Sequence, residues 1–147
     1  MFRDFIKSRE VREGSPDYEL SKSLEKIAKL RMANIEKQEV TDDNSFSVVE
    51  DSYESVKELI DALMALRGYK SYSHEASIEF LKEFYANEVP AHIINRIDRY
   101  RKIRNDIKYR GLLTTKEEGN LAMKEMKEAF LVIISIFNKM LKNQPKA

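Results

Sequence analysis

The sequence predicts an all-α protein, an up-down antiparallel bundle of four to five helices. Apolar residues recur at helical spacing along almost the whole chain of 147 residues. Only four Gly and three Pro interrupt this pattern, and no Asn-Gly or Asp-Gly turn joins alternating segments. Short polar connections favour antiparallel neighbours. At this length we expect a single domain over residues 1–147, with 1–14 as an N-terminal extension and 15–142 as the bundle.

The first helix is predicted to begin at Ser15, with Pro16 in its first turn, because Ser caps helices and Pro fits the first helical position. Its inward face is expected to carry Leu20, Leu24, Ile27 and Leu30. Upstream, a short amphipathic turn is expected through Phe2, Phe5 and Ile6. The polar segment 39–47 has the composition of a loop.

The second helix has the clearest pattern, since apolar residues spaced four and three apart mark one face. These residues are Val49, Tyr53, Val56, Ile60 and Leu63. Gly68 supplies a natural stop for this helix. The third helix is predicted to start near Ser73 and to end before Pro90. Its buried residues are expected to be Ile78, Leu81 and Phe84.

The last two helices are predicted over about 92–108 and from residue 114 onward. The fourth should bury one stripe made of Ile93, Ile97, Tyr100, Ile103 and Ile107. The last opens with Thr114-x-x-Glu117, which matches a capping box. Its buried face is expected to carry Ala122, Met126, Ala129, Ile133, Ile136 and Met140. Because residues 130–137 are almost wholly apolar, this helix is expected to be central in the bundle.

The most unusual segment is 96–110, RIDRYRKIRNDIKYR, which Gly111 closes. It holds seven basic and two acidic residues, a local balance of +5 in a chain whose net charge is +1. Localised positive charge is typical of proteins that bind polyanions or phosphate groups. The candidate phosphate- or RNA-binding residues are Arg101, Lys102, Arg104, Lys108 and Arg110.

Helical geometry separates the polar residues of this segment. Arg104 falls at the border of the apolar stripe, and Lys108 follows one turn later. Asn105 and Tyr109 are also one turn apart, on a different face. Because Arg104 and Tyr109 are about 140° apart around a straight helix, a site that uses both needs a frayed helix end or a second copy of the chain.

The run from Arg104 to Tyr109, RNDIKY, resembles the motif of the HEPN superfamily. That motif is an Arg, commonly followed by a polar residue, with a His four to six positions later. Tyr72-Ser73-His74 and Glu83-Phe84 are similar to the middle of archaeal members. The resemblance spans roughly residues 15–142, and its specific part is about ten residues long.

The resemblance implies a homodimer that cleaves RNA without a metal or other cofactor, with the motifs of two copies meeting across a cleft. It assigns Arg104 to the phosphate, Asn105 to the polar second position, and Tyr109 to the position of the catalytic His. Some members act in toxin–antitoxin or defence systems beside a nucleotidyltransferase-type antitoxin. Such an antitoxin is therefore an expected partner.

Two functions remain open at this point. The Tyr side chain titrates near pH 10 and is a poor base at neutral pH, so we expect a dimer that binds RNA or nucleotide phosphate without cleaving it. The alternative is an active metal-independent endoribonuclease that uses Arg104. His74 and His92 both precede Arg104, so local structural roles are expected for them.

Composition excludes several other classes of protein. The chain has no Cys, which excludes disulfides, thiolate metal sites and cysteine nucleophiles. No His, Asp and Glu cluster has the spacing of metal ligands. No apolar run approaches the roughly 20 residues of a membrane helix, and the N-terminus lacks the apolar core of a signal peptide. We therefore expect a cytoplasmic protein with no membrane association.

Overall fold

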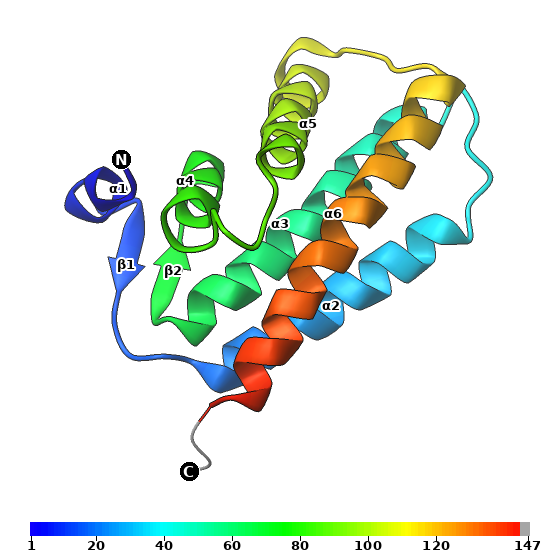
Figure 1. Cartoon of the computed structure of the whole chain (residues 1–147). Helices are drawn as coiled ribbons and strands as arrows, with labels where there is room; N and C mark the ends of the chain where they lie inside the picture. Colours follow the sequence, from blue (N-terminus) through cyan, green and yellow to red (C-terminus); the bar gives the residue numbers. More distant parts are fainter. Residues whose placement is uncertain (145–147) are drawn as a thin grey trace.

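The computed structural model describes residues 1–144, and within this range it contains six helices and one two-stranded sheet. The elements are α1 Phe2–Lys7, β1 Val11–Glu13, α2 Tyr18–Glu36, α3 Ser45–Leu66, β2 Tyr69–Ser71, α4 His74–Phe84, α5 Ala91–Arg110 and α6 Lys116–Lys142. The predicted all-α helical bundle is confirmed (Figure 1). None of the helices in the described range is both long and apolar enough to cross a bilayer.

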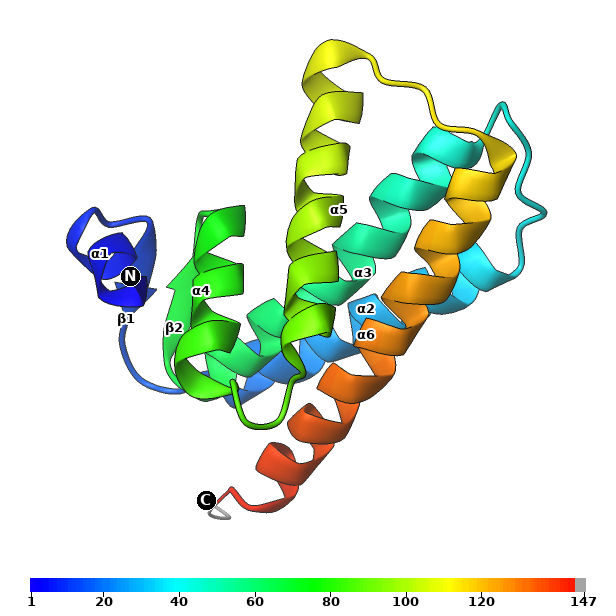
Figure 2. The ribbon, with the colours of Figure 1, turned by 45° about the horizontal axis from the view of Figure 1, so that its top comes forward.

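The central helix of the bundle is α3, which packs against α2, α4, α5 and α6 (Figure 2). All five apolar residues predicted for its stripe are buried, and so are residues on its other sides, including Leu59 and Met64. The expectation that the last helix is central is wrong. Leu131, in the apolar run 130–137, is 54% exposed, because α6 covers α3 with one face only and turns the other to solvent.

Helices α3 and α6 run in the same direction, with their N-terminal ends in contact (Figures 1 and 2). Ser45 Oγ donates to the Thr115 carbonyl oxygen over 2.6 Å. It also lies 2.7 Å from Thr114 Oγ1, which must be the donor of that bond because the Ser45 proton is already used. A Cβ atom added to Gly119 would lie only 2.5 Å from Ser45 Oγ, so this glycine permits the close approach.

Two predicted helix starts are shifted. Helix α2 begins at Tyr18, and its cap is Asp17, whose carboxylate accepts from the Leu20 amide over 3.0 Å, rather than Ser15. The capping box of α6 is formed by Thr115 and Glu118, one residue later than predicted, and both of its hydrogen bonds are present. The reason for the second shift is that the Thr114 hydroxyl is buried against α3.

The buried face of α2 also differs from the expected one. Ile27 and Leu30 are 46% and 55% exposed, whereas the residues that are buried are Ser21, Ala28, Met32 and Ile35. Small residues on this face let α2 approach α3 closely, and the Ser55 hydroxyl donates to the Ala28 carbonyl oxygen over 3.0 Å. The buried side of α2 therefore combines the small Ser21 and Ala28 with the larger Met32 and Ile35.

Residues 1–14 pack onto the bundle through a short sheet and an aromatic cluster. Strands β1 and β2 pair antiparallel, with Val11 opposite Ser71. The two three-residue strands carry no pattern long enough to predict them. Phe2 is 2% exposed, and its ring meets those of Tyr69, Phe80 and Phe84 at 5.2 to 5.7 Å.

The structure places the helices on either side of Pro90 much as expected. The predicted cap Ser73 accepts from the Ala76 amide over 3.3 Å, and α4 ends at Phe84. Helix α5 follows directly after Pro90 and ends at Arg110, where Gly111 adopts the left-handed conformation with φ of 67°. The predicted α5 stripe is buried, with only Ile103 half-buried.

Candidate functional site

The seven basic residues of segment 96–110 have different surroundings in the folded protein. Five of them form ion pairs with acidic side chains, namely Arg96, Arg99, Arg101, Lys102 and Arg110. Arg104 and Lys108 have no acidic partner within residues 1–144. Five of the seven positive charges are therefore already paired with carboxylates, and two remain that can pair with a bound anion.

Two of the paired arginines join α5 to α6 through the buried carboxylate of Glu125. Arg96 Nε lies 2.8 Å and Arg99 Nη2 lies 2.6 Å from its oxygens. The Tyr100 hydroxyl donates to the same carboxylate over 2.7 Å. Arg96 also pairs with Glu128. Because these groups satisfy one buried carboxylate, we assign them to the packing of the two helices.

Three of the predicted phosphate-binding residues are paired with acids close to α5. Arg101 bonds Asp98 over 2.9 Å and lies 3.6 Å from Glu75, and only 12% of its side chain is exposed. Lys102 reaches Asp98 at 3.5 Å, and Arg110 reaches its neighbour one turn back, Asp106, at 3.7 Å. A phosphate group at any of these three positions would compete with a carboxylate.

Arg104 and Lys108 lie one turn apart on α5, as the helical geometry predicted. Arg104 is half-buried, and its Nη1 donates to Asn105 Oδ1 over 3.1 Å. Lys108 Nζ stands 5.7 Å from the ring centre of Tyr109, a cation–π arrangement. The Tyr109 side chain is 72% exposed, so Arg104 and Tyr109 of one copy do not point to a common site.

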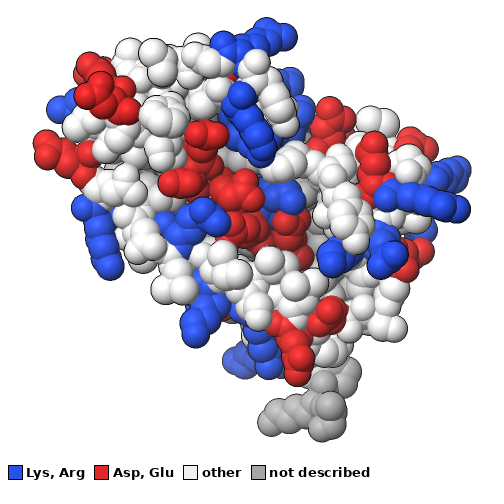
Figure 3. Space-filling view, turned by 180° about the vertical axis from the view of Figure 1, so that it is seen from behind, with Lys and Arg blue, Asp and Glu red and all other residues white. Residues whose placement is uncertain are grey.

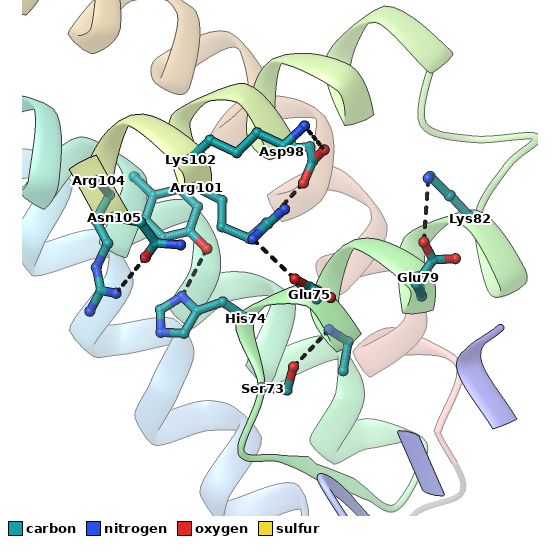
Figure 4. Close-up of polar contacts among 12 residues, drawn as sticks. Ser73, His74, Glu75, Glu79, Lys82, Asp98, Arg101, Lys102, Arg104 and Asn105 are labelled. Atoms are coloured by element: carbon teal, nitrogen blue, oxygen red, sulfur yellow. Dashed lines mark hydrogen bonds and ion pairs between the residues drawn. The ribbon is translucent and has the colours of Figure 1, made fainter. Parts of the chain in front are cut away.

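His74 lies beside Arg104, at the first position of α4. Figure 4 shows His74, Arg104 and Asn105 gathered between the start of α4 and the C-terminal half of α5. His74 Nδ1 is 2.9 Å from the hydroxyl of Tyr53, which comes from α3, and the two rings are stacked with centres 5.7 Å apart. Three helices therefore contribute to the site.

The His74 ring is held neutral. Burial is the largest cause that lowers the pKa of His74, and together with the positive charges of Lys57, Arg104, Arg101 and Lys108 it brings this pKa to about 4. Burial also raises the pKa of the Tyr53 hydroxyl above its ordinary value. At neutral pH the site consequently holds an uncharged imidazole, an uncharged phenol and two unpaired cations.

An ion pair on α3 contributes to the low pKa of His74. Lys57 and Asp61 follow Tyr53 by one and two turns, and Lys57 Nζ lies 2.7 Å from Asp61 Oδ2. Burial raises the pKa of Asp61 to about 6 despite this partner. Lys57 is itself buried, so its charge acts on His74 with little screening by water.

His74 and Tyr53 were not among the residues that the sequence singled out for the site. The Tyr53 ring was expected in the apolar stripe of α3, where it lies, but its hydroxyl partner is on another helix. His74 was expected to be structural because it precedes Arg104 in the sequence. The only sequence feature that bears on its position is the cap Ser73, which places His74 in the first turn of α4.

The chemistry open to this site is that of anion binding and proton transfer. Within the described chain no group of three or more His, Asp and Glu side chains could hold a metal ion. The face opposite to that of Figure 1 carries acidic side chains near its middle, with Lys and Arg around them (Figure 3). That face is therefore mixed in charge and is not a continuous basic surface.

Comparisons of the chain with protein-family models, with curated proteins and with solved structures find no match.

Proposed function

We propose that this protein binds the phosphate groups of RNA or nucleotides through Arg104 and Lys108, beside His74. One observation carries the proposal. Of seven basic residues in segment 96–110, these two alone lack an acidic partner in the described chain, and the charges of both reach the same neutral imidazole. A guanidinium fork pairs with two phosphate oxygens at once, and a Lys ammonium adds a point charge.

The resemblance to the HEPN superfamily supports RNA or nucleotide as the source of the phosphate. On that resemblance we propose a homodimer in which the Tyr109 side chain of one copy approaches the Arg104 site of the other. Tyr109 is well exposed on its own copy, as such a role requires. A nucleotidyltransferase-type antitoxin remains a proposed partner, in a toxin–antitoxin or defence system.

Binding without cleavage is the function that we favour, because the motif position of the catalytic His is Tyr109. One observation supports the alternative, a metal-independent endoribonuclease. His74 is an imidazole beside Arg104, and its hydrogen bond to Tyr53 orients the ring, much as a second residue orients a catalytic His in other enzymes.

The test measures binding of a labelled RNA oligonucleotide in EDTA, by fluorescence anisotropy at several salt concentrations. We expect Arg104→Ala and Lys108→Ala to weaken binding and each to reduce the slope of log affinity against log salt by about 1. Lys102→Ala is the matched control, since it removes an exposed charge of the same helix that is already paired with Asp98. Equal effects of all three substitutions would refute the assignment of the site.

The same samples separate binding from cleavage. Gel analysis after long incubation should show intact RNA if the favoured function is correct. Metal-independent cleavage that is lost in Arg104→Ala would establish the endoribonuclease instead. Light scattering at micromolar concentration tests the homodimer, and a monomer would contradict it.

A further inference from the structure

We propose that His74 takes up a proton when a phosphate group binds at Arg104 and Lys108, so that the protein binds RNA more tightly as the pH falls. This inference rests on the proposed function. It adds a regulation of the same site by pH, and it gives His74 a role in ligand binding that its place in the sequence does not indicate.

The contact between His74 and Tyr53 allows the proton to be gained while both rings keep their positions, because only the phenol hydrogen has to turn away from Nδ1. Among residues 1–144 the Tyr53 hydroxyl has no hydrogen-bond partner other than His74 Nδ1, at 2.9 Å. In the neutral pair the phenol donates to Nδ1, and the imidazole proton is therefore on Nε2. After protonation Nδ1 donates to the phenol oxygen across the same distance, because a hydroxyl can donate or accept.

The charges around His74 explain why the proton is absent in the free protein. The cations whose charges act on the ring are Arg101, Arg104 and Lys108 on α5 and Lys57 on α3. Figure 4 shows Arg101 and Arg104 on the same side of α4 as His74, and the neutral Tyr53 of α3 is hydrogen-bonded to the ring. The acidic groups near this cluster are those of Glu54, Asp61 and Glu75. Asp61 is paired with Lys57, and Glu75 is exposed beside Arg101. The net field is positive, and burial lowers the pKa of His74 in the same direction.

A bound phosphate changes this balance at the two cations that have no acidic partner. Its negative charge offsets those of Arg104 and Lys108, which are two of the four cations that keep the proton away. The pKa of His74 then rises towards its ordinary value of about 6.5. Because coupling between two binding events is reciprocal, a ligand that favours the proton is itself favoured by the proton.

The measurement is an NMR titration of the histidine ring signals with and without RNA. The chain has two His, and His92 on the exposed first turn of α5 serves as an internal reference. The probe is a 2′-O-methyl oligouridylate with hydroxyl groups at both ends. It cannot be cleaved through a 2′-hydroxyl, and neither its bases nor its phosphodiesters titrate between about pH 3 and pH 7, the range that the His74 titration covers.

We expect saturating oligouridylate to raise the His74 midpoint by at least about one pH unit. The affinity for the oligonucleotide should rise by about tenfold over the matching pH range, and His74→Gln should remove this dependence. The wild-type titration decides the question alone, so a variant that fails to fold does not affect it.

A parallel titration with uridine 5′-monophosphate distinguishes the source of the phosphate. A shift of His74 with the oligonucleotide alone indicates an RNA backbone, and a shift with the mononucleotide alone indicates a terminal phosphate. If oligonucleotide or mononucleotide binds in an Arg104-dependent way but leaves the His74 midpoint unchanged, the proton uptake is refuted and the proposed function stands. If neither binds in an Arg104-dependent way, both are refuted.

Discussion

At the scale of single residues, arginines that look alike in the sequence have different surroundings in the bundle. Helical geometry predicted that Arg104 lies at the border of the α5 stripe, and its half-buried side chain agrees with this. Geometry of one helix could not predict that Arg99 pairs with Glu125, because that carboxylate belongs to α6. The availability of a charge thus depends on packing between helices, which the sequence of one helix does not contain.

The His74 and Tyr53 pair illustrates the same limit for the candidate site. The apolar stripe correctly predicted that the Tyr53 ring is buried, and the cap correctly placed His74 at the start of α4. Their contact arises only because α4 crosses α3 at this point. A periodic pattern describes which face of a helix is buried, but it does not say which polar atoms meet there.

At this scale we predict that His74 makes stability depend on pH. The folded-state pKa of His74 is about 4, below the ordinary value of about 6.5, so the unfolded chain binds more protons between these values. The free energy of unfolding of the wild type, relative to His74→Gln, should therefore increase as the pH rises from about 4 to about 6.5 and stay constant above that.

Urea denaturation of both proteins at several pH values measures this difference. Asp61, whose pKa is raised to about 6, has the opposite effect: its contribution to the free energy of unfolding decreases as the pH rises towards 6. Because Asp61 is present in both proteins, this contribution cancels in the comparison. His92→Gln is the matched control and should follow the wild type. A constant difference between wild type and His74→Gln across the range would show that the folded-state pKa is not lowered.

At the scale of elements, the residue that caps a helix depends on the contacts that neighbouring elements make with the candidate side chains. Ser73 caps α4 as predicted. Thr114 and Thr115 are equally good caps in the sequence. The Thr114 hydroxyl, however, is hydrogen-bonded to Ser45 of α3, so Thr115 caps α6. The helices themselves follow from periodicity, whereas their exact starts depend on contacts between elements.

The connection between α5 and α6 gives a prediction at this scale. Glu125 is buried and accepts from Arg96, Arg99 and Tyr100, so Glu125→Ala leaves these donors without their shared partner. We expect the free energy of unfolding to fall by about 1–3 kcal/mol, as for other buried groups that lose a hydrogen-bond partner. Chemical denaturation monitored by circular dichroism measures the change.

Glu128→Ala is the matched control for this prediction. Glu128 also pairs with Arg96, but 48% of its side chain is exposed, so its loss should cost about 0–1 kcal/mol. Similar losses in the two variants would mean that Glu125 does not join the helices more strongly than a surface ion pair does.

At the scale of the whole molecule, the N-terminal segment completes the core rather than extending from it. Phe2 is buried among Tyr69, Phe80 and Phe84, which belong to β2 and α4. The sequence indicated an amphipathic turn at this end, and α1 is that turn. It could not indicate the docking position, because the strands that fix it are three residues long.

We predict that Phe2→Ala lowers the free energy of unfolding by about 3–5 kcal/mol, the usual cost of removing a buried aromatic ring. Phe46→Ala is the control, because Phe46 is 39% exposed on α3 and its loss should cost about 1 kcal/mol or less. Thermal and urea denaturation measure both variants. A small effect of Phe2→Ala would indicate that α1 contributes little to the core.

The pairing of β1 with β2 also sets an order for the folding of the chain. Residues 2–13 are synthesised before residues 69–84, so Val11 and Phe2 find their partners only after that later segment has been made. Helices α2 and α3 are neighbours in sequence and in space, so they can associate earlier. Residues 2–13 therefore dock later than their place in the sequence suggests, and until then their apolar side chains stay exposed to solvent and to other chains.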